Sequence, residues 1–152
     1  AAPMSDHPYW FRQMQAAVRM NASNDALRAI AARSHSCHDA AENAAAWLRT
    51  VLPYRFDGAH HRILSLREAL ARGYGACGDA TAAIATVLIE RGSVAIVAYE
   101  ATETLEGYAH VRIAMGRLFV DAYPEASIDA PCAARLELTK ASVRWPPPLA
   151  RA

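Results

Sequence analysis

The feature that most constrains the fold is a change in the spacing of apolar residues near Gly92. Before it, apolar residues recur every three or four positions, as they do in amphipathic helices. After it, residues 94–99 form a β-branched run, residues 108–115 alternate between apolar and polar, and residues 118–122 resemble a further short strand. Helices followed by neighbouring strands predict an α+β fold in which N-terminal helices pack on a small antiparallel sheet.

Local signals predict where individual helices begin and end. Ser5 or Asp6 could cap a first helix, with Pro8 in its first turn. Ser65 is a suitable cap for a short helix that stops at Gly73. Further helices are expected over residues 25–33, over residues 37–52 and from the turn at residues 73–79 to Gly92, and a last strand is expected near residues 136–138.

Length and charge restrict the class of protein. A chain of 152 residues fits one domain, here with a helical part (1–53), a central core (54–124) and a C-terminal tail (125–152). The chain is 53% hydrophobic and 20% charged, which excludes a disordered chain, and a net charge of +1 argues against nucleic acid as a partner. Alanine supplies 35 residues, so the core should depend on close helix packing.

The cysteines and the absence of targeting signals bear on location. No apolar run approaches the roughly 18 residues of a membrane span, and no secretory signal is evident, so we expect no membrane partner and a cytoplasmic location. Three cysteines do not form a disulfide framework: Cys37 could pair with Cys132, or all three could be free. His35, Cys37 and His38 lack the paired spacing of a closed zinc site, so no metal is expected.

Cys77 is the strongest candidate for a reactive group, because it stands where the Gly-rich turn runs into an apolar helix. A helix N-terminus carries partial positive charge and unpaired N–H groups, which favour a thiolate and can stabilise an oxyanion. Gly75 and Gly78 would leave the backbone open to a substrate. Asp79 is most simply a partner of the helix dipole. The alternative for Cys77 is an inert packing residue.

His110 and Asp121 are candidates for the base and the group that orients it. The pair at residues 116–117, Gly-Arg, suits a two-residue type II′ hairpin, which puts Arg112 opposite Asp121 and makes His110 a diagonal neighbour of Asp121. Asp121 could then hold one imidazole nitrogen and leave the other for Cys77. Two alternatives stay open: an Arg112–Asp121 ion pair without catalysis, or a register slip that separates His110 from Asp121.

These motifs occur in the order found in a known family. Gly73-Tyr74-Gly75-Ala76-Cys77-Gly78-Asp79, with the apolar helix and Gly92 after it, resembles the core of the bacterial transglutaminase-like superfamily. Tyr108-Ala109-His110-Val111 and Phe119-Val120-Asp121 fall where that family has its strand His and Asp, and Ser65-Leu66-Arg67-Glu68-Ala69-Leu70 resembles its short preceding helix. The similarity covers residues 54–124. Many members follow the His with Ala-Trp, whereas this chain has Val111-Arg112, so cross-linking activity is not implied.

The resemblance implies a papain-like fold and thiol chemistry on amide bonds, with Cys77 as nucleophile, His110 as general base and acid, and Asp121 as orienter. We therefore expect an amide hydrolase or acyl transferase, such as a peptidase or deamidase, that acts on a peptide or protein without a cofactor. Hydrolysis is favoured, because a small open domain admits water to the acyl-enzyme. The alternatives are a catalytically silent peptide-binding adaptor and a leader peptidase whose N-terminal helices would expose the Trp10-Phe11-Met14 face.

Tyr74, Gly75 and Arg112 are the candidate substrate-binding residues. Tyr74 could line the cleft, or equally it could pack against Trp47. Arg112 could select an acidic substrate group, although an ion pair with Asp121 or Glu103 is the simpler expectation.

Overall fold

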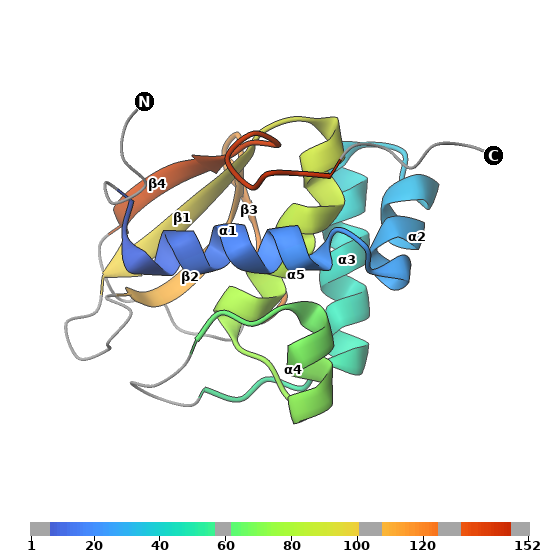
Figure 1. Cartoon of the computed structure of the whole chain (residues 1–152), viewed down its shortest axis with the longest axis horizontal. Coiled ribbons are helices and arrows are strands. Elements are labelled where there is room, and N and C mark those ends of the chain that lie inside the picture. The colour runs from blue at the N-terminus through green and yellow to red at the C-terminus, as the bar shows by residue number, and fades with distance from the viewer. Residues whose placement is uncertain (1–6, 57–61, 101–107, 125–131, 147–152) are drawn as a thin grey trace.

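The computed structural model describes residues 7–56, 62–100, 108–124 and 132–146. Within these ranges the chain forms five α-helices and a four-stranded antiparallel sheet, which confirms the α+β class (Figure 1). No helix in this part of the chain is both long and apolar enough to cross a bilayer. The elements are α1 (Tyr9–Asn21), α2 (Asp25–Arg33), α3 (Cys37–Val51), α4 (Leu66–Arg72), α5 (Cys77–Leu88), the 3-10 helix η3 (Ile89–Arg91), β1 (Val94–Glu100), β2 (Tyr108–Met115), β3 (Leu118–Val120) and β4 (Cys132–Leu138).

The helix α5 is the centre of the fold. It contacts α1, α2, α3 and α4 and also packs against β2 (Figure 1). The apolar spacing predicted one buried face, but every residue of α5 is buried. Small residues such as Ala82 and Ala85 let neighbouring helices approach the other faces, so this helix is enclosed on all sides.

Buried alanines are frequent in α3 and α5, two helices that pack against each other. Four alanines of α3, four of α5 and the α5 N-cap residue are buried: Ala40, Ala41, Ala44, Ala45, Ala80, Ala82, Ala83, Ala85 and Ala76. Small side chains allow two helix axes to come close together. The expectation that the alanine excess serves close helix packing is therefore confirmed.

The strands lie in the order β3-β2-β1-β4. Met115 pairs with Leu118 across a two-residue turn, and only the first turn residue, Gly116, has a positive φ (63°), as a type II′ turn requires. One face of the sheet, including Val111 and Ile113, joins the main core under the helices. The opposite face carries a separate small cluster of Ala95, Val97, Tyr99 and Ala114.

Local caps explain both ends of α4. Ser65 and Glu68 form a reciprocal capping box at the start of α4, and Gly73 ends that helix in the left-handed conformation (φ 95°). The prediction for α1 was wrong in one respect: Pro8 stands at the N-cap and not in the first turn, and it makes no side-chain cap. Ser5 and Asp6 lie outside the described residues. The last strand, β4, begins at Cys132, earlier than the predicted residues 136–138.

Candidate functional site

The turn before Cys77 is fixed by backbone pairing and by close packing. Two backbone hydrogen bonds of 2.9 Å join Gly75 to residues 53–55 in a parallel bridge. A Cβ atom at Gly75 would stand 2.7 Å from Leu52 Cγ, so the packing of Leu52 requires a glycine here. The space beside Gly75 is thus filled by the core, and Cys77 follows as the first residue of α5.

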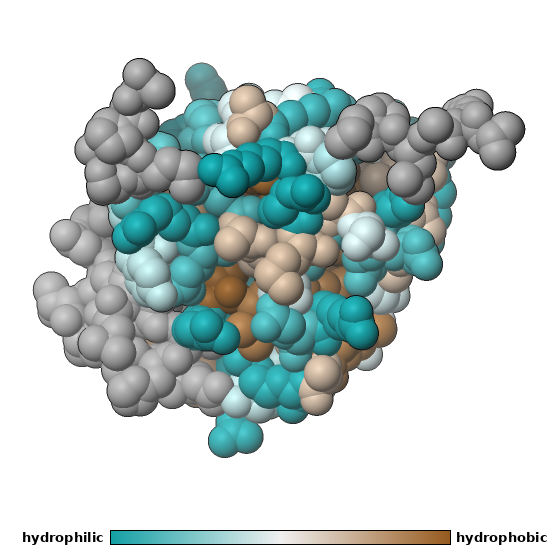
Figure 2. Space-filling view, in the orientation of Figure 1, coloured by the Kyte–Doolittle hydropathy of each residue, from teal (hydrophilic) through white to brown (hydrophobic). Residues whose placement is uncertain are grey.

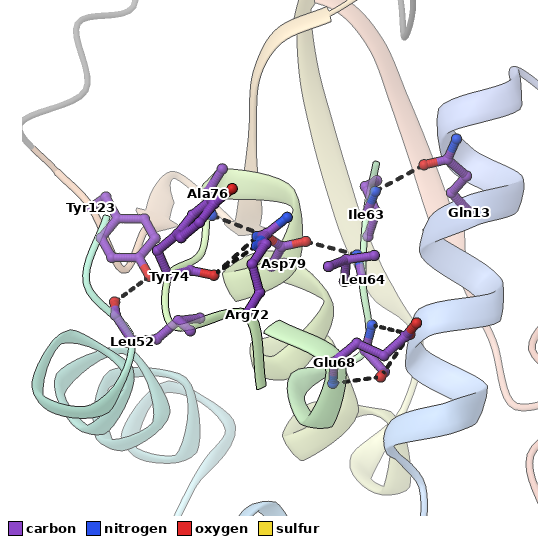
Figure 3. Close-up of polar contacts among 11 residues, drawn as sticks. Gln13, Leu52, Ile63, Leu64, Glu68, Arg72, Tyr74, Ala76, Asp79 and Tyr123 are labelled. Atoms are coloured by element: carbon purple, nitrogen blue, oxygen red, sulfur yellow. Dashed lines mark hydrogen bonds and ion pairs between the residues drawn. The ribbon is translucent and has the colours of Figure 1, made fainter. Parts of the chain in front are cut away.

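Asp79 holds the start of α5 to two other segments (Figure 3). Its Oδ2 accepts hydrogen bonds from the Ala76 N–H (2.9 Å) and from Arg72 Nη2 (2.8 Å), and its Oδ1 accepts one from the Leu64 N–H (2.7 Å). The side chain is completely buried. Asp79 does lie in the first turn, where it favours the helix dipole, but it also ties the residues around Cys77 together.

Tyr74 is half-buried and stacks with cationic side chains. The Arg72 guanidinium lies 4.2 Å from the centre of its ring, and that of Arg55 lies 5.0 Å away. The Tyr74 carbonyl also accepts two hydrogen bonds from Arg72 (3.0 and 3.2 Å). These contacts hold Tyr74 beside the Cys77 turn.

The end of β3 brings α5 to the edge of the sheet. The strand β3 stops at Val120, which pairs with Ile113. Next along β2, the Val111 carbonyl accepts a hydrogen bond of 3.2 Å from Thr81 Oγ1. The first turns of α5 therefore lie beside β2 just past the end of β3, which places Cys77 close to His110.

The structure brings the three candidate catalytic side chains together. His110 Nε2 contacts Asp121 Oδ2, and the two side chains are only 4% and 11% exposed. The other carboxylate oxygen of Asp121 accepts a hydrogen bond of 3.0 Å from the Tyr123 N–H. The Cys77 side chain is a further neighbour of the imidazole, close enough to raise its pKa. Since Asp121 uses Nε2, Nδ1 is the ring nitrogen left for the thiol.

The charge state of His110 follows from these partners. Burial lowers the pKa of His110, but the hydrogen bonds to Asp121 and Cys77 and the negative charges of both groups outweigh burial and raise it to about 9. His110 is therefore an imidazolium at neutral pH. A thiol beside a protonated imidazole is the arrangement that favours a thiolate–imidazolium pair.

Arg112 does not form the ion pair with Asp121 that its register position suggested. Its Nε and Nη2 donate to the Tyr99 hydroxyl (3.0 and 2.6 Å), and its guanidinium lies 3.8 Å from the centre of the Phe119 ring. Asp121 follows the last residue of β3, and its carboxylate is turned toward His110. The observed register also excludes the one-residue slip.

Two tyrosines beside the site were not identified from the sequence. The rings of Tyr54 and Tyr123 are 5.0 Å apart, and the Tyr123 hydroxyl donates to the Leu52 carbonyl (2.7 Å). Burial, followed by the negative charges of Cys77 and Asp121, raises the pKa of Tyr54. Tyr54 is nevertheless 48% exposed, so a ligand could reach its neutral hydroxyl. Its place beside Cys77 depends on the bridge to Gly75, for which the sequence has no local signal.

Cys37, Cys132 and His38 are not part of this site. Cys37 and Cys132 are exposed free thiols and are not joined to each other. His38 lies 3.7 Å from Glu42. Across residues 7–56, 62–100, 108–124 and 132–146, no group of three or more His, Cys, Asp or Glu side chains could hold a metal ion.

Comparisons of this chain with protein-family models, with curated proteins and with solved structures found no match. The resemblance to the transglutaminase-like superfamily therefore stays a prediction from the quoted residues. The arrangement of Cys77, His110 and Asp121 is the observation from which a function can be argued.

Proposed function

We propose that this protein is a cysteine-dependent amide hydrolase or acyl transferase with a transglutaminase-like, papain-like core. The observation that carries the proposal is the position of His110, which contacts Asp121, lies next to Cys77 and is nearly excluded from solvent. A buried histidine held between a helix-terminal thiol and a carboxylate has the partners that thiol catalysis needs.

Each group has a defined role in the proposed reaction. The Cys77 thiolate attacks the carbonyl carbon of an amide, and the oxyanion that forms accepts hydrogen bonds from N–H groups at the start of α5. The C–N bond then breaks while His110 gives its proton to the leaving amine, which leaves a thioester on Cys77. Water attacks the thioester, His110 takes a proton from that water, and the acid is released. Asp121 holds the ring by Nε2 and stabilises the imidazolium.

The proposed substrate is a peptide or protein, and water is the favoured acceptor. Tyr74 and Arg112 remain candidate binding residues, and the exposed Tyr54 joins them. Gly75 would act through its backbone, since Leu52 occupies the space beside it. The three free cysteines fit a reducing, cytoplasmic compartment.

The two alternatives lack the observations that would favour them. A leader peptidase was expected to expose the Trp10-Phe11-Met14 face of α1, yet these side chains are 5%, 1% and 0% exposed. A silent adaptor would be favoured by a His110 out of reach of both partners, yet His110 contacts Asp121 and lies next to Cys77.

Alkylation by iodoacetamide at pH 7, followed by mass spectrometry of each cysteine peptide, tests the proposal. Cys37 is a matched control, because it is the first residue of α3 as Cys77 is of α5, so both thiols share the helix-dipole effect. We expect Cys77 to react faster than the more exposed Cys37, and His110→Ala to remove the difference. Equal or slower reaction at Cys77 would contradict an activated thiolate.

Turnover provides the second test. A panel of peptide amides, monitored by amine or ammonia release, should include a substrate for the wild-type protein. Cys77→Ala should keep the fold, measured by circular dichroism, and abolish release. Retained release in Cys77→Ala would end the proposal.

A further inference from the structure

Arg112 is held in one orientation on the sheet face that carries His110. Its guanidinium donates twice to the Tyr99 hydroxyl and stacks on the Phe119 ring. Tyr99 is itself buried, and it pairs with His110 across the β1–β2 ladder. The charged end of Arg112 is thus fixed by an aromatic platform and not by an opposite charge.

The described residues offer Arg112 no carboxylate partner. Its contacts in these ranges are the Tyr99 hydroxyl and the faces of the Tyr99 and Phe119 rings, and none of the ion pairs includes it. A guanidinium has five N–H donors and is charged at all physiological pH values. With Nε and one donor of Nη2 used on Tyr99, the Nη1 end is left for an acceptor.

Arg112 lies at a useful distance from the reacting groups. It follows His110 by two positions, so both side chains project from the same face, about 7 Å apart along the strand. The Tyr99 ring is near both groups, 6.4 Å from the His110 ring and 5.1 Å from the Arg112 guanidinium. This spacing corresponds to about two residues of an extended chain.

We propose that Arg112 binds a substrate carboxylate, so that the preferred substrates carry a carboxylate within about two residues of the amide that Cys77 attacks. The inference rests on the proposed function of Cys77. A guanidinium accepts a carboxylate through two parallel hydrogen bonds, and one that is already oriented loses little freedom on binding. Both a peptide C-terminus and an acidic side chain provide this group.

Matched alkylating reagents test the proposal without a known substrate. The first pair is N-iodoacetylglycine and N-iodoacetylglycinamide, which differ by a terminal carboxylate. The second pair is the N-iodoacetyl derivatives of aspartic acid α-amide and asparagine α-amide, which differ by a side-chain carboxylate. In each reaction the thiolate sulfur forms a bond to the CH₂ carbon and iodide leaves. The rate ratio, acid over amide, is measured at Cys77 and, as an internal reference, at Cys37 and Cys132 of the same molecules.

We expect the ratio at Cys77 to exceed the reference ratios by about fivefold for at least one pair, a factor equivalent to roughly 1 kcal/mol. The pair that shows it identifies the source of the carboxylate. Arg112→Gln should bring the ratio down to the reference value, and Arg112→Lys should keep part of the excess. Arg117→Gln, which removes an exposed charge from the hairpin turn of the same sheet, should leave the excess intact.

Two results would overturn the proposal: equal ratios at Cys77 and the reference thiols in the wild-type protein, or an excess that persists in Arg112→Gln. Failure of the proposed function gives a different result. In that case Cys77 reacts with the neutral amides no faster than Cys37 does, while its acid-to-amide ratio still reports on Arg112.

Discussion

Replacement of Asp121 by Asn tests the electrostatic basis of the site, because it keeps the shape of the side chain and removes its charge. Burial lowers the pKa of His110, and the bonds to Asp121 and Cys77 raise it to about 9. Without the Asp121 charge, burial is opposed only by the interaction with Cys77, and the pKa of His110 should fall from about 9 toward its ordinary value of 6.5. The change from about 9 to 6.5 corresponds to roughly 3 kcal/mol of interaction with the imidazolium.

The same change predicts how stability depends on pH. The pKa of His110 is higher in the folded than in the unfolded protein, so its contribution is fully present below pH 6.5 and is lost as the pH rises through about 9. Asp121→Asn should therefore lower the free energy of unfolding by up to roughly 3 kcal/mol at pH 6 and by little at pH 10. The His110 side chain is only 4% exposed, so solvent screening is slight.

Two measurements check this prediction. NMR titration of the histidine Cε1–H signals, with His110 assigned by loss of its signal in His110→Gln, measures the pKa. Urea unfolding at pH 6 and pH 10 measures the stability difference. Asp25→Asn is the control, since Asp25 is an exposed acid in the first turn of α2. A His110 pKa that stays near 9 in Asp121→Asn, or an equal stability loss at both pH values, would refute the reasoning.

Three further predictions concern the turn and the reaction. Gly75→Ala should lower the free energy of unfolding in urea by about 1–3 kcal/mol, because the new methyl group overlaps Leu52. The loss should be smaller in a Leu52→Ala background, and equal losses would show that packing on Leu52 is not the reason for the glycine. Asp79→Asn should lower the free energy of unfolding by about 3–5 kcal/mol in the same assay, because the Arg72 guanidinium and two backbone N–H groups lose their charged acceptor. A loss below about 1 kcal/mol would contradict this explanation. The rate of amide turnover should fall as the pH rises through about 9, because His110 then loses the proton that it gives to the leaving amine. The rate of alkylation by iodoacetamide should not fall over the same range, and a parallel fall of both rates would indicate unfolding.

Features that depend on a few neighbouring residues could be predicted from the sequence. The type II′ turn at Gly116 sets the β2–β3 register by itself, and that register makes His110 and Asp121 neighbours. Ser65 and Gly73 define both ends of α4 for the same reason, since each cap acts on the backbone within one turn.

Features that depend on distant segments could not be predicted. Tyr54 lies beside the site only because its segment pairs with Gly75, and nothing in either segment specifies a parallel bridge. The enclosure of α5 on all sides likewise depends on where four other helices pack. An ion pair between Arg112 and Asp121 was expected because the sequence predicted a strand over residues 118–122, whereas β3 ends at Val120.

The early end of β3 connects these observations. If the strand continued through Asp121, that residue would stand opposite Arg112 with both side chains on one face, and the cross-strand ion pair would be the expected result. Because β3 stops at Val120, the Asp121 carboxylate can accept the Tyr123 N–H and turn to His110, and Arg112 is left on Tyr99 and Phe119. No residue of β3 pairs with Val111, and its carbonyl accepts a hydrogen bond from Thr81 instead. The end of β3 at Val120 therefore accounts for three features: α5 packs beside β2, Asp121 contacts His110, and Arg112 binds Tyr99 and Phe119 instead of Asp121.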